Sequence, residues 1–341
     1  MIAGIMMDFK KLEFFLENEP GYRSKQIEKA LYHDLIEDWS HATSLPNYLR
    51  TRLNSEFPID KYNNSKVTSL VNNTLKNKTI LGDGLAIESV LMMYEGKRNT
   101  VCVSSQAGCP LGCIFCKTGE IGFKRNLEVF EIIGQVLFFA RYLKKAGTRI
   151  TNIVFMGMGE PFLNFTNVSE AIGILNNKEK LNIGARHISV STAGLLDGIR
   201  KFANIGIQAN LAISLNAPNN GLRTKIMPIN KKHPIGKLMK AASYYVKKTK
   251  RRVMFEYVLI KDLNDSLELA EELAGLLKNY LYFVNLIPYN GKGKLKPPST
   301  RTISSFKKIL KDNHINVTER FRFGRDINAA CGQLACNGKN N

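Results

Sequence analysis

Short apolar runs alternate with longer amphipathic stretches over most of the chain after residue 98. Strand-like runs rich in Val, Ile and Phe occupy residues 100–105, 151–157, 187–192, 209–215, 253–260 and 282–289. Between them, stretches such as 129–147, 235–248 and 267–280 carry apolar residues at helical spacing. This alternation predicts βαβ units and a parallel sheet. Because a complete α/β barrel has eight strands, six units predict a partial, six-stranded parallel α/β barrel.

The residues before this core have a different pattern. Residues 22–35 and 45–57 carry apolar positions near helical spacing, with basic residues between them. We therefore expect a small helical N-terminal domain over residues 1–80, with an accessory or RNA-binding role. Residues 84–96 are rich in strand formers and predict a connecting hairpin within 81–98. The core then spans 99–336, including a C-terminal cysteine loop, and 337–341 form a polar tail.

Charge and cysteine content narrow the class of protein. Lys and Arg outnumber Asp and Glu by 49 to 29, and the net charge of +20 favours a polyanionic partner, either nucleic acid or an anionic membrane surface. A generally Lys-rich proteome is the alternative explanation. No run is apolar enough to span a membrane, and the first residues form a poor signal peptide. Six cysteines are too few for a disulfide scaffold, so we expect a reducing cytoplasm. We also expect a monomer.

Four of the cysteines fall within "VCVSSQAGCPLGCIFC" at residues 101–116. Cys109, Cys113 and Cys116 have the spacing C-x3-C-x2-C, directly after the first predicted strand of the core. Iron–sulfur clusters are held by thiolates, and three thiolates on a [4Fe-4S] cluster leave one iron open for another ligand. Structural zinc prefers four ligands in two pairs, and no second pair lies nearby. Buried or zinc-binding cysteines remain the alternative.

The triplet, with Phe115 before its last cysteine, resembles the radical S-adenosylmethionine (SAM) superfamily. This resemblance implies that the open iron binds SAM and that electron transfer cleaves SAM to a 5′-deoxyadenosyl radical. By the same resemblance, the loop "FMGMGEP" at 155–161 grips the amino group of SAM. The resemblance implies these SAM-site residues: Gly159, Glu160, Ser191, Ser214, Leu215, Asn216 and Asn290.

Two observations weigh on these assignments. Most of these polar residues lie where a predicted strand ends, so the alternative is that they merely finish the strands. The close family usually has His where Asn216 stands; Asn can hydrogen-bond through its amide but cannot titrate.

Five motifs in family order resemble the RlmN group of dual-specificity RNA methyltransferases. They are "CVSSQAGCPLGCIFC", "FMGMGEP", "IMPIN", "NLIPYN" and "DINAACGQLA", and the match runs over residues 84–336. The resemblance implies methylation of carbon 2 of an adenosine, in the peptidyl transferase centre of 23S rRNA and 3′ of the anticodon in tRNA. It implies two SAM molecules per turnover and an electron from a flavodoxin-like or ferredoxin-like reductant.

The same resemblance assigns three further catalytic roles. Cys331 is the S-methylcysteine intermediate, which joins protein and RNA in a transient adduct. Cys102 is the resolving thiol, which forms a transient disulfide with Cys331, and Glu88 is the proton acceptor. The alternative for Cys102 is a small buried hydrophobe, and for Glu88 an outward-facing salt-bridge partner. Cys336 has no counterpart in the family motif.

Two basic segments are candidates for RNA contact. Residues 247–252, "KKTKRR", and residues 291–296, "GKGKLK", add phosphate affinity without specifying a sequence. The alternative for the first is a solvated helix end. The second follows a predicted strand at the catalytic edge, where the target adenine must be unstacked into the site.

Three rival functions remain. The sister group, Cfr, methylates carbon 8 of the same rRNA adenosine and shares the cysteines; "AIESV", "SSQAGC" and "NKKHPI" favour the RlmN group. A zinc-stabilised RNA-binding protein without catalytic activity would need a fourth zinc ligand. A glycyl-radical activating enzyme shares the triplet but explains neither Cys331 nor the basic charge.

Overall fold

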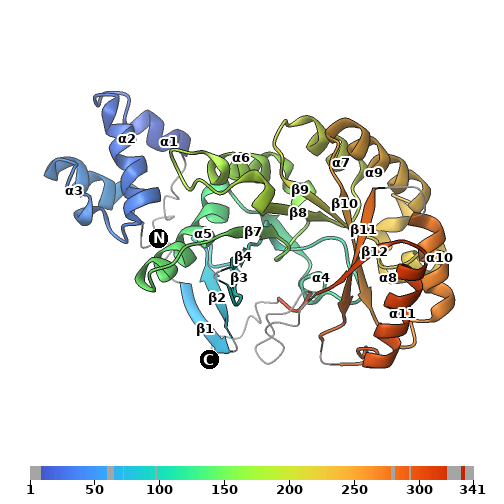
Figure 1. Ribbon diagram of the computed structural model, residues 1–341. Helices are drawn as coiled ribbons and strands as arrows, with labels where there is room; N and C mark the ends of the chain where they lie inside the picture. Colours follow the sequence, from blue (N-terminus) through green and yellow to red (C-terminus); the bar gives the residue numbers. More distant parts are fainter. Residues whose placement is uncertain are drawn as a thin grey trace.

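The computed structural model describes residues 9–59, 65–71, 73–96, 98–277, 281–291, 293–320 and 332–334. One sheet dominates it, with ten strands in the order β1-β2-β3-β4-β7-β8-β9-β10-β11-β12. A separate two-stranded ribbon pairs β5 (Gln106–Gly108) with β6 (Phe123–Asn126). Figure 1 shows the large sheet curved into an open barrel with helices on its outside.

The predicted α/β core is confirmed. The six predicted strands correspond to β4 (Asn99–Cys102), β7 (Asn152–Phe155), β8 (Ile188–Thr192), β9 (Asn210–Ser214), β10 (Val253–Leu259) and β11 (Tyr282–Pro288). They are parallel neighbours in chain order. A further parallel strand, β12 (Asn316–Glu319), extends the edge. Its sequence, "NVTE", contains no apolar run, which is why the pattern did not predict it.

Helices connect the strands and cover their outer face. Between the strands lie α5 (Val129–Lys145), α6 (Phe165–Asn176), α7 (Leu196–Asn204), α8 (Asn220–Ile226), α9 (Ile235–Thr249), α10 (Leu267–Leu277) and α11 (Thr300–Asp312). The short helix α4 (Lys117–Ile121) follows the cysteine loop. A capping box at Glu128 and Glu131 starts α5, and the buried face of that helix joins the core. The helices predicted over 129–147, 235–248 and 267–280 are thus confirmed within the described residues.

The two faces of the sheet differ in polarity. Register partners share a face, and side chains alternate along each strand. Ile153, Val190, Leu211 and Phe255 lie on the outer face and are almost completely buried under the helices. The inner face carries Ser189, Ser191, Ser214 and Glu256 in the alternate positions. The inner face therefore presents polar side chains to the ligand space at β8, β9 and β10, between smaller apolar residues such as Val154 and Ala212.

The N-terminal region is helical only in part. α1 (Phe9–Phe15), α2 (Tyr22–Lys29), a π-helical turn (Ala30–Asp34) and α3 (Asn47–Glu56) pack around Trp39, whose indole N–H donates to the carbonyl of Phe57 at 2.7 Å. Figure 1 shows these helices as a separate lobe beside α5. Arg141 of α5 donates to the carbonyls of Leu35 and Ile36 and so attaches this lobe to the core.

The prediction of helix up to residue 80 is wrong for β1 (Ser65–Val71) and β2 (Thr74–Ile80). Both belong to the large sheet, and the predicted hairpin over 81–98 is a single strand, β3 (Ala86–Met93), that pairs with β2 on one side and β4 on the other. Asn73 takes a positive φ of 60° in the β1–β2 turn, a conformation that Asn tolerates. Polar residues lie on both faces of β2: Lys76 shares the inner face with Glu88, whereas Asn77 and Thr79 are buried on the other face, where the Asn77 amide donates to the Thr79 hydroxyl.

Candidate active site

The three clustered cysteines lie on one loop between β5 and α4. Gly108 enters the loop with φ of +77°, and a Cβ there would meet the carbonyl oxygen of Gly122 at 1.8 Å, so only glycine fits. Cys109 donates its backbone N–H to Gly122 at 3.1 Å, and Cys116 donates to the carbonyl of Cys113 at 3.0 Å. The loop is therefore held by its own backbone, and the thiols are left to face outward from it.

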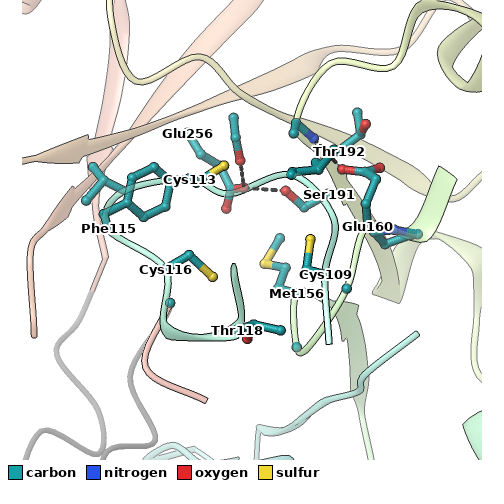
Figure 2. A pocket seen from close by; sticks show the side chains of 18 of the residues that line it. Cys109, Cys113, Phe115, Cys116, Thr118, Met156, Glu160, Ser191, Thr192 and Glu256 are labelled. Carbon is teal, nitrogen blue, oxygen red and sulfur yellow. Dashed lines mark hydrogen bonds between the residues drawn. The ribbon is translucent and has the colours of Figure 1, made fainter. Parts of the chain in front are cut away.

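All three thiols line one cavity at the carboxyl ends of the parallel strands. Figure 2 shows Cys109, Cys113 and Cys116 around this space, with Glu160 and Ser191 beside them. About 870 Å³ is not filled by protein atoms, part of it open to solvent. The structure thus brings together the cysteine triplet and the glycine loop, as the sequence predicts.

The three thiols share the wall of one cavity. Thiolates are the usual ligands of iron–sulfur clusters, in which each sulfur binds its own iron. Burial raises the pKa of the Cys109 thiol to about 12 and also raises that of Cys113. The free thiols are therefore protonated, and metal binding must displace their protons.

The glycines of the 155–161 loop allow two pieces of backbone to touch. A Cβ on Gly157 would meet the carbonyl oxygen of Val103 at 2.6 Å, and one on Gly159 would meet the Cβ of Gln106 at 2.5 Å. Gly159 also has a φ of +98°. Both glycines line the cavity. The loop is thus packed directly on the segment that leads into the cysteine triplet.

Glu160 is a buried carboxylate that no cation pairs with among the described residues. One oxygen accepts the backbone N–H of Ala193 at 2.7 Å, and the other accepts that of Phe162 at 3.1 Å. Burial raises its pKa to about 7, although these hydrogen bonds work against the shift. A carboxylate held in this way at the wall of a cavity is suited to accept hydrogen bonds from a ligand ammonium group.

Ser191 and Ser214 lie where predicted, at the ends of β8 and β9, and both line the cavity. Both hydroxyls donate to one oxygen of Glu256, at 3.4 Å from Ser214 and at 2.5 Å from Ser191. Figure 2 shows Ser191 beside Glu256. Arg320 pairs with the other oxygen at 3.7 Å. Sequence reasoning missed Glu256. The available signal was a lone acidic residue inside the apolar strand "VMFEYVLI", at an inward-facing position.

Three of the predicted SAM-site residues are not part of the cavity wall. Leu215 is buried in the core, and Asn216 takes a φ of 60°. The amide oxygen of Asn216 accepts the N–H of Val258 at 2.8 Å, and its amide nitrogen donates to the sulfur of Met227. The amide oxygen of Asn290 is buried and has no hydrogen-bond partner among the residues that the structure describes. A role of these residues in SAM binding stays a prediction.

Cys102 and Glu88 lie on the inner face of the sheet. Cys102 is buried and pairs in register with Val154 on one side and Val90 on the other. Val154 pairs with Ser189, which lies two residues from Ser191. Cys102 therefore lies on the same inner face as Ser189 and Ser191. Glu88 lies two residues before Val90 on the same face. Neither residue lines the cavity itself.

Glu88 forms a buried ion pair. The ammonium of Lys76 lies 2.8 Å from its carboxylate, and both side chains are less than one-tenth exposed. The alternative for Glu88 was an outward-facing salt-bridge partner. Glu88 does form a salt bridge, but the pair lies on the inner face of the sheet. The carboxylate oxygens face the same side of the sheet as Cys102, whereas the backbone carbonyl of Glu88 accepts the hydroxyl of Ser104 at 2.6 Å.

Cys331 and Cys336 lie outside the described residues, so the proposed pairing of Cys102 with Cys331 is not shown. The three residues Gly332–Leu334 are described, and they contact the cysteine loop. The backbone N–H of Lys117 donates to the carbonyl of Gly332 at 2.7 Å, and the buried hydroxyl of Thr118 donates to that of Leu334 at 2.7 Å. Gly332 and Leu334 line the cavity. The residues that directly follow Cys331 are therefore attached beside the triplet.

The two basic segments lie at opposite ends of the barrel. Residues 247–252 end α9 and precede β10, at the amino end of the parallel strands, and Arg251 donates to Asn210 there. This position favours a solvated helix end. The described residues of 291–296 follow β11 at its carboxyl end, on the side of the cavity. Lys296 accepts a backbone hydrogen bond from Lys261 at 2.9 Å.

Comparison with known proteins agrees with this arrangement. Residues 103–274 match the model of the radical SAM superfamily. The chain is 49% identical over 318 residues to a probable dual-specificity RNA methyltransferase RlmN of Dictyoglomus thermophilum, covering 93% of this chain and 91% of the relative. It is 44% identical to the protein of the same description from Geobacillus kaustophilus, covering 98% and 92%. The chain belongs to the RlmN family of radical SAM methyltransferases.

A solved structure supports the same family assignment. The crystal structure of a radical SAM methyltransferase from Sphaerobacter thermophilus matches with a TM-score of 0.91 and 43% identity, covering 96% of this chain and 97% of that one. As a member of this family the protein is an enzyme whose cofactors are a [4Fe-4S] cluster and SAM. Cys109, Cys113 and Cys116 form the donor set that fits the cluster. None of the described helices is long and apolar enough to cross a membrane.

Proposed function

We propose that this protein methylates carbon 2 of adenosine in 23S rRNA and in tRNA through a methylated cysteine, Cys331. The family assignment supports an RNA methyltransferase, since the relatives are described as dual-specificity RNA methyltransferases. The net charge of +20 suits a polyanionic substrate. The observation that carries the proposal is that Cys102, Glu88 and Ser191 lie on the same inner face of the sheet. In addition, Gly332 is attached beside the cysteine triplet.

Carbon 2 of adenine is not a nucleophile, so a direct displacement on SAM does not serve. When bound, the cluster and two SAM molecules supply one methyl group and one radical that removes a hydrogen atom from it. Cys331 carries that methyl group on its sulfur and presents it to the ring. The methylene then bonds to carbon 2, which joins the protein to the RNA.

Two inner-face residues then release the product. Glu88 takes the proton that carbon 2 loses, and its ion pair with Lys76 holds the carboxylate on the inner face of the sheet. The Cys102 thiolate attacks the Cys331 sulfur, forming an S–S bond and breaking the bond from sulfur to methylene. The electron pair of the broken bond stays with the methylene, which takes a proton and becomes the new methyl group. Addition of the methylene radical leaves one unpaired electron on the ring, and this electron passes to a one-electron acceptor, the oxidised form of the external reductant, so that the ring becomes aromatic again. A flavodoxin-like or ferredoxin-like reductant supplies the electrons for SAM cleavage and for reopening the disulfide.

Removal of the resolving thiol tests this sequence. In a Cys102→Ala protein, the cysteine ligands and Glu160 are unchanged, so SAM cleavage should continue. Release should stop, and a covalent protein–RNA adduct should accumulate and be visible by denaturing gel electrophoresis with labelled RNA. Cys336→Ala is the matched control and should turn over without accumulating the adduct. A Cys102→Ala protein that turns over at the normal rate would contradict the assignment.

The zinc-stabilised binding protein is less well supported. No three ligating side chains close on a single ion among the described residues, and the family assignment provides a cluster instead. The Cfr-type alternative, methylation of carbon 8, uses the same cysteines and differs in where the adenine sits. It is decided by the identity of the product nucleoside.

A further inference from the structure

Arg223 is a buried cation whose hydrogen bonds are all made to uncharged groups. It lies on α8 and is completely buried. Its acceptors are the backbone oxygens of Leu215, Ala193, Ser214 and His233 and the amide oxygen of Asn230, at 2.7 to 3.4 Å. Within the described residues no carboxylate pairs with it. A buried guanidinium without a counter-ion is costly, even when each N–H finds an oxygen.

The helix that carries Arg223 touches the cysteine loop. The backbone N–H of Ile114, which follows Cys113, donates to the carbonyl of Ile226 at 3.1 Å. Cys113 also packs against a small apolar cluster that includes Ile226 and Met227. Two carbonyls that Arg223 binds belong to Ala193 and Ser214, which line the cavity. Arg223 is thus fixed directly behind the wall that the cysteine triplet shares with the SAM site.

The surroundings of Arg223 show where its counter-charge must come from. Burial disfavours the charged guanidinium and lowers its pKa to about 10, so the charge needs compensation from a nearby anion. The cysteine loop, which α8 contacts through Ile114 and Ile226, is where bound thiolates would provide it. The positive charge therefore acts on the triplet, where a cluster with three thiolates brings net negative charge and becomes more negative by one unit on reduction.

We propose that Arg223 is a positioning residue that provides the fixed counter-charge for the thiolate-bound cluster and thereby raises its reduction potential. The bonds to Ala193, Leu215 and Ser214 hold the guanidinium at one place behind the wall of the cavity that the cysteine triplet lines. Reduction of a cluster held by the three thiolates would add one negative charge there, and the unchanged positive charge of Arg223 would stabilise the reduced form. The proposal depends on the cluster alone and not on which adenosine carbon is methylated.

Two substitutions cancel the positive charge by different routes. Arg223→Gln removes it, whereas Asn230→Asp places a carboxylate on the same guanidinium, at a contact of 3.0 Å, and neutralises it without removing the arginine. Arg223→Lys keeps the charge but gives up most of the hydrogen bonds. Lys225→Gln removes one positive charge from the exposed side of the same helix and is the matched control.

The measurement is a redox titration of the anaerobically reconstituted full-length protein, followed by the spectrum of the reduced cluster. Arg223→Gln and Asn230→Asp should each lower the equilibrium constant for reduction by about tenfold, which is about 59 mV for one electron. Arg223→Lys should retain most of the wild-type potential, and Lys225→Gln should match the wild type.

The outcomes separate the charge from a purely structural role. Equal shifts in Arg223→Lys and Arg223→Gln would mean that the hydrogen bonds matter and the charge does not, and would overturn the proposal. So would an unchanged potential in Asn230→Asp with normal iron content. Where Arg223→Gln fails to fold, Asn230→Asp still decides, because the arginine and its backbone contacts remain. A failure of the RNA assignment would leave all four potentials unaffected.

Discussion

The hydroxyl of Thr118 binds the segment that directly follows Cys331, so its removal tests how that segment is held. It is buried at the start of α4, and its 2.7 Å hydrogen bond to the carbonyl of Leu334 is one of two bonds that attach Gly332–Leu334 to the cysteine loop. In Thr118→Val the shape is kept but the carbonyl loses its partner. A buried polar group left without a partner costs about 1–3 kcal/mol, so the equilibrium constant for docking this segment should fall by about 5-fold to 150-fold.

The assay is single-turnover methylation of Cys331, followed by mass spectrometry of the peptide that contains it. The rate should fall in Thr118→Val within that range and stay close to the wild type in Thr118→Ser, which keeps the hydroxyl. Iron content per protein serves as the control, because the cysteine ligands are untouched. A Thr118→Val protein that methylates Cys331 at the wild-type rate would refute the reasoning, as would a Thr118→Ser protein with an equal defect.

Two further predictions concern the glycine loop. Gly157→Ala should destabilise the protein by about 1–3 kcal/mol, because the new Cβ overlaps the backbone of Val103, and thermal unfolding should show a lower Tm. Gly173→Ala in α6, where a Cβ meets nothing within 4 Å, should instead raise the Tm slightly, and a loss there equal to that of Gly157→Ala would contradict the steric argument. SAM affinity, measured by calorimetry, should fall as pH drops below about 7, because Glu160 must be ionised to bind an ammonium and burial places its pKa there. The sign for the ligand-free protein is opposite: its folded-state pKa is raised above 4.5, so stability falls as pH rises from about 4.5 to 7. Glu160→Gln should abolish both dependences, and a persistent pH profile in that variant would assign them to another group.

The parts of the fold that sequence predicted are those where pattern and burial coincide. Six strands have one face under the helices and the other toward the cavity. Their sequences are still mostly apolar, because the side chains under the helices are large and hydrophobic. β2 was not predicted, because pattern and burial disagree there. Lys76 and Asn77 are buried in this strand, although Lys and Asn are usually exposed. β12 is a short, polar edge strand, and nothing in its pattern distinguishes it from a loop.

The site divides in the same way. The cysteine triplet and Glu160 were predictable, because their chemistry is carried by spacing within one segment. Glu256 and Arg223 were not, because each acts through partners far away in the chain: Glu256 collects Ser191 and Ser214, whereas Arg223 resembles an ordinary surface cation in "NGLRTKI". Only the folded structure shows that both charged side chains are buried.

The central claim is methyl transfer to carbon 2, and the product nucleoside tests it most directly. Anaerobically reconstituted protein, a chemical reductant and SAM with a deuterated methyl group are incubated with a 23S rRNA fragment or with tRNA. The RNA is then digested, and the labelled nucleoside is compared by chromatography and mass spectrometry with 2-methyladenosine and 8-methyladenosine standards. We expect labelled 2-methyladenosine from both RNAs. Labelled 8-methyladenosine, or SAM cleavage without any labelled adenosine, would contradict the account.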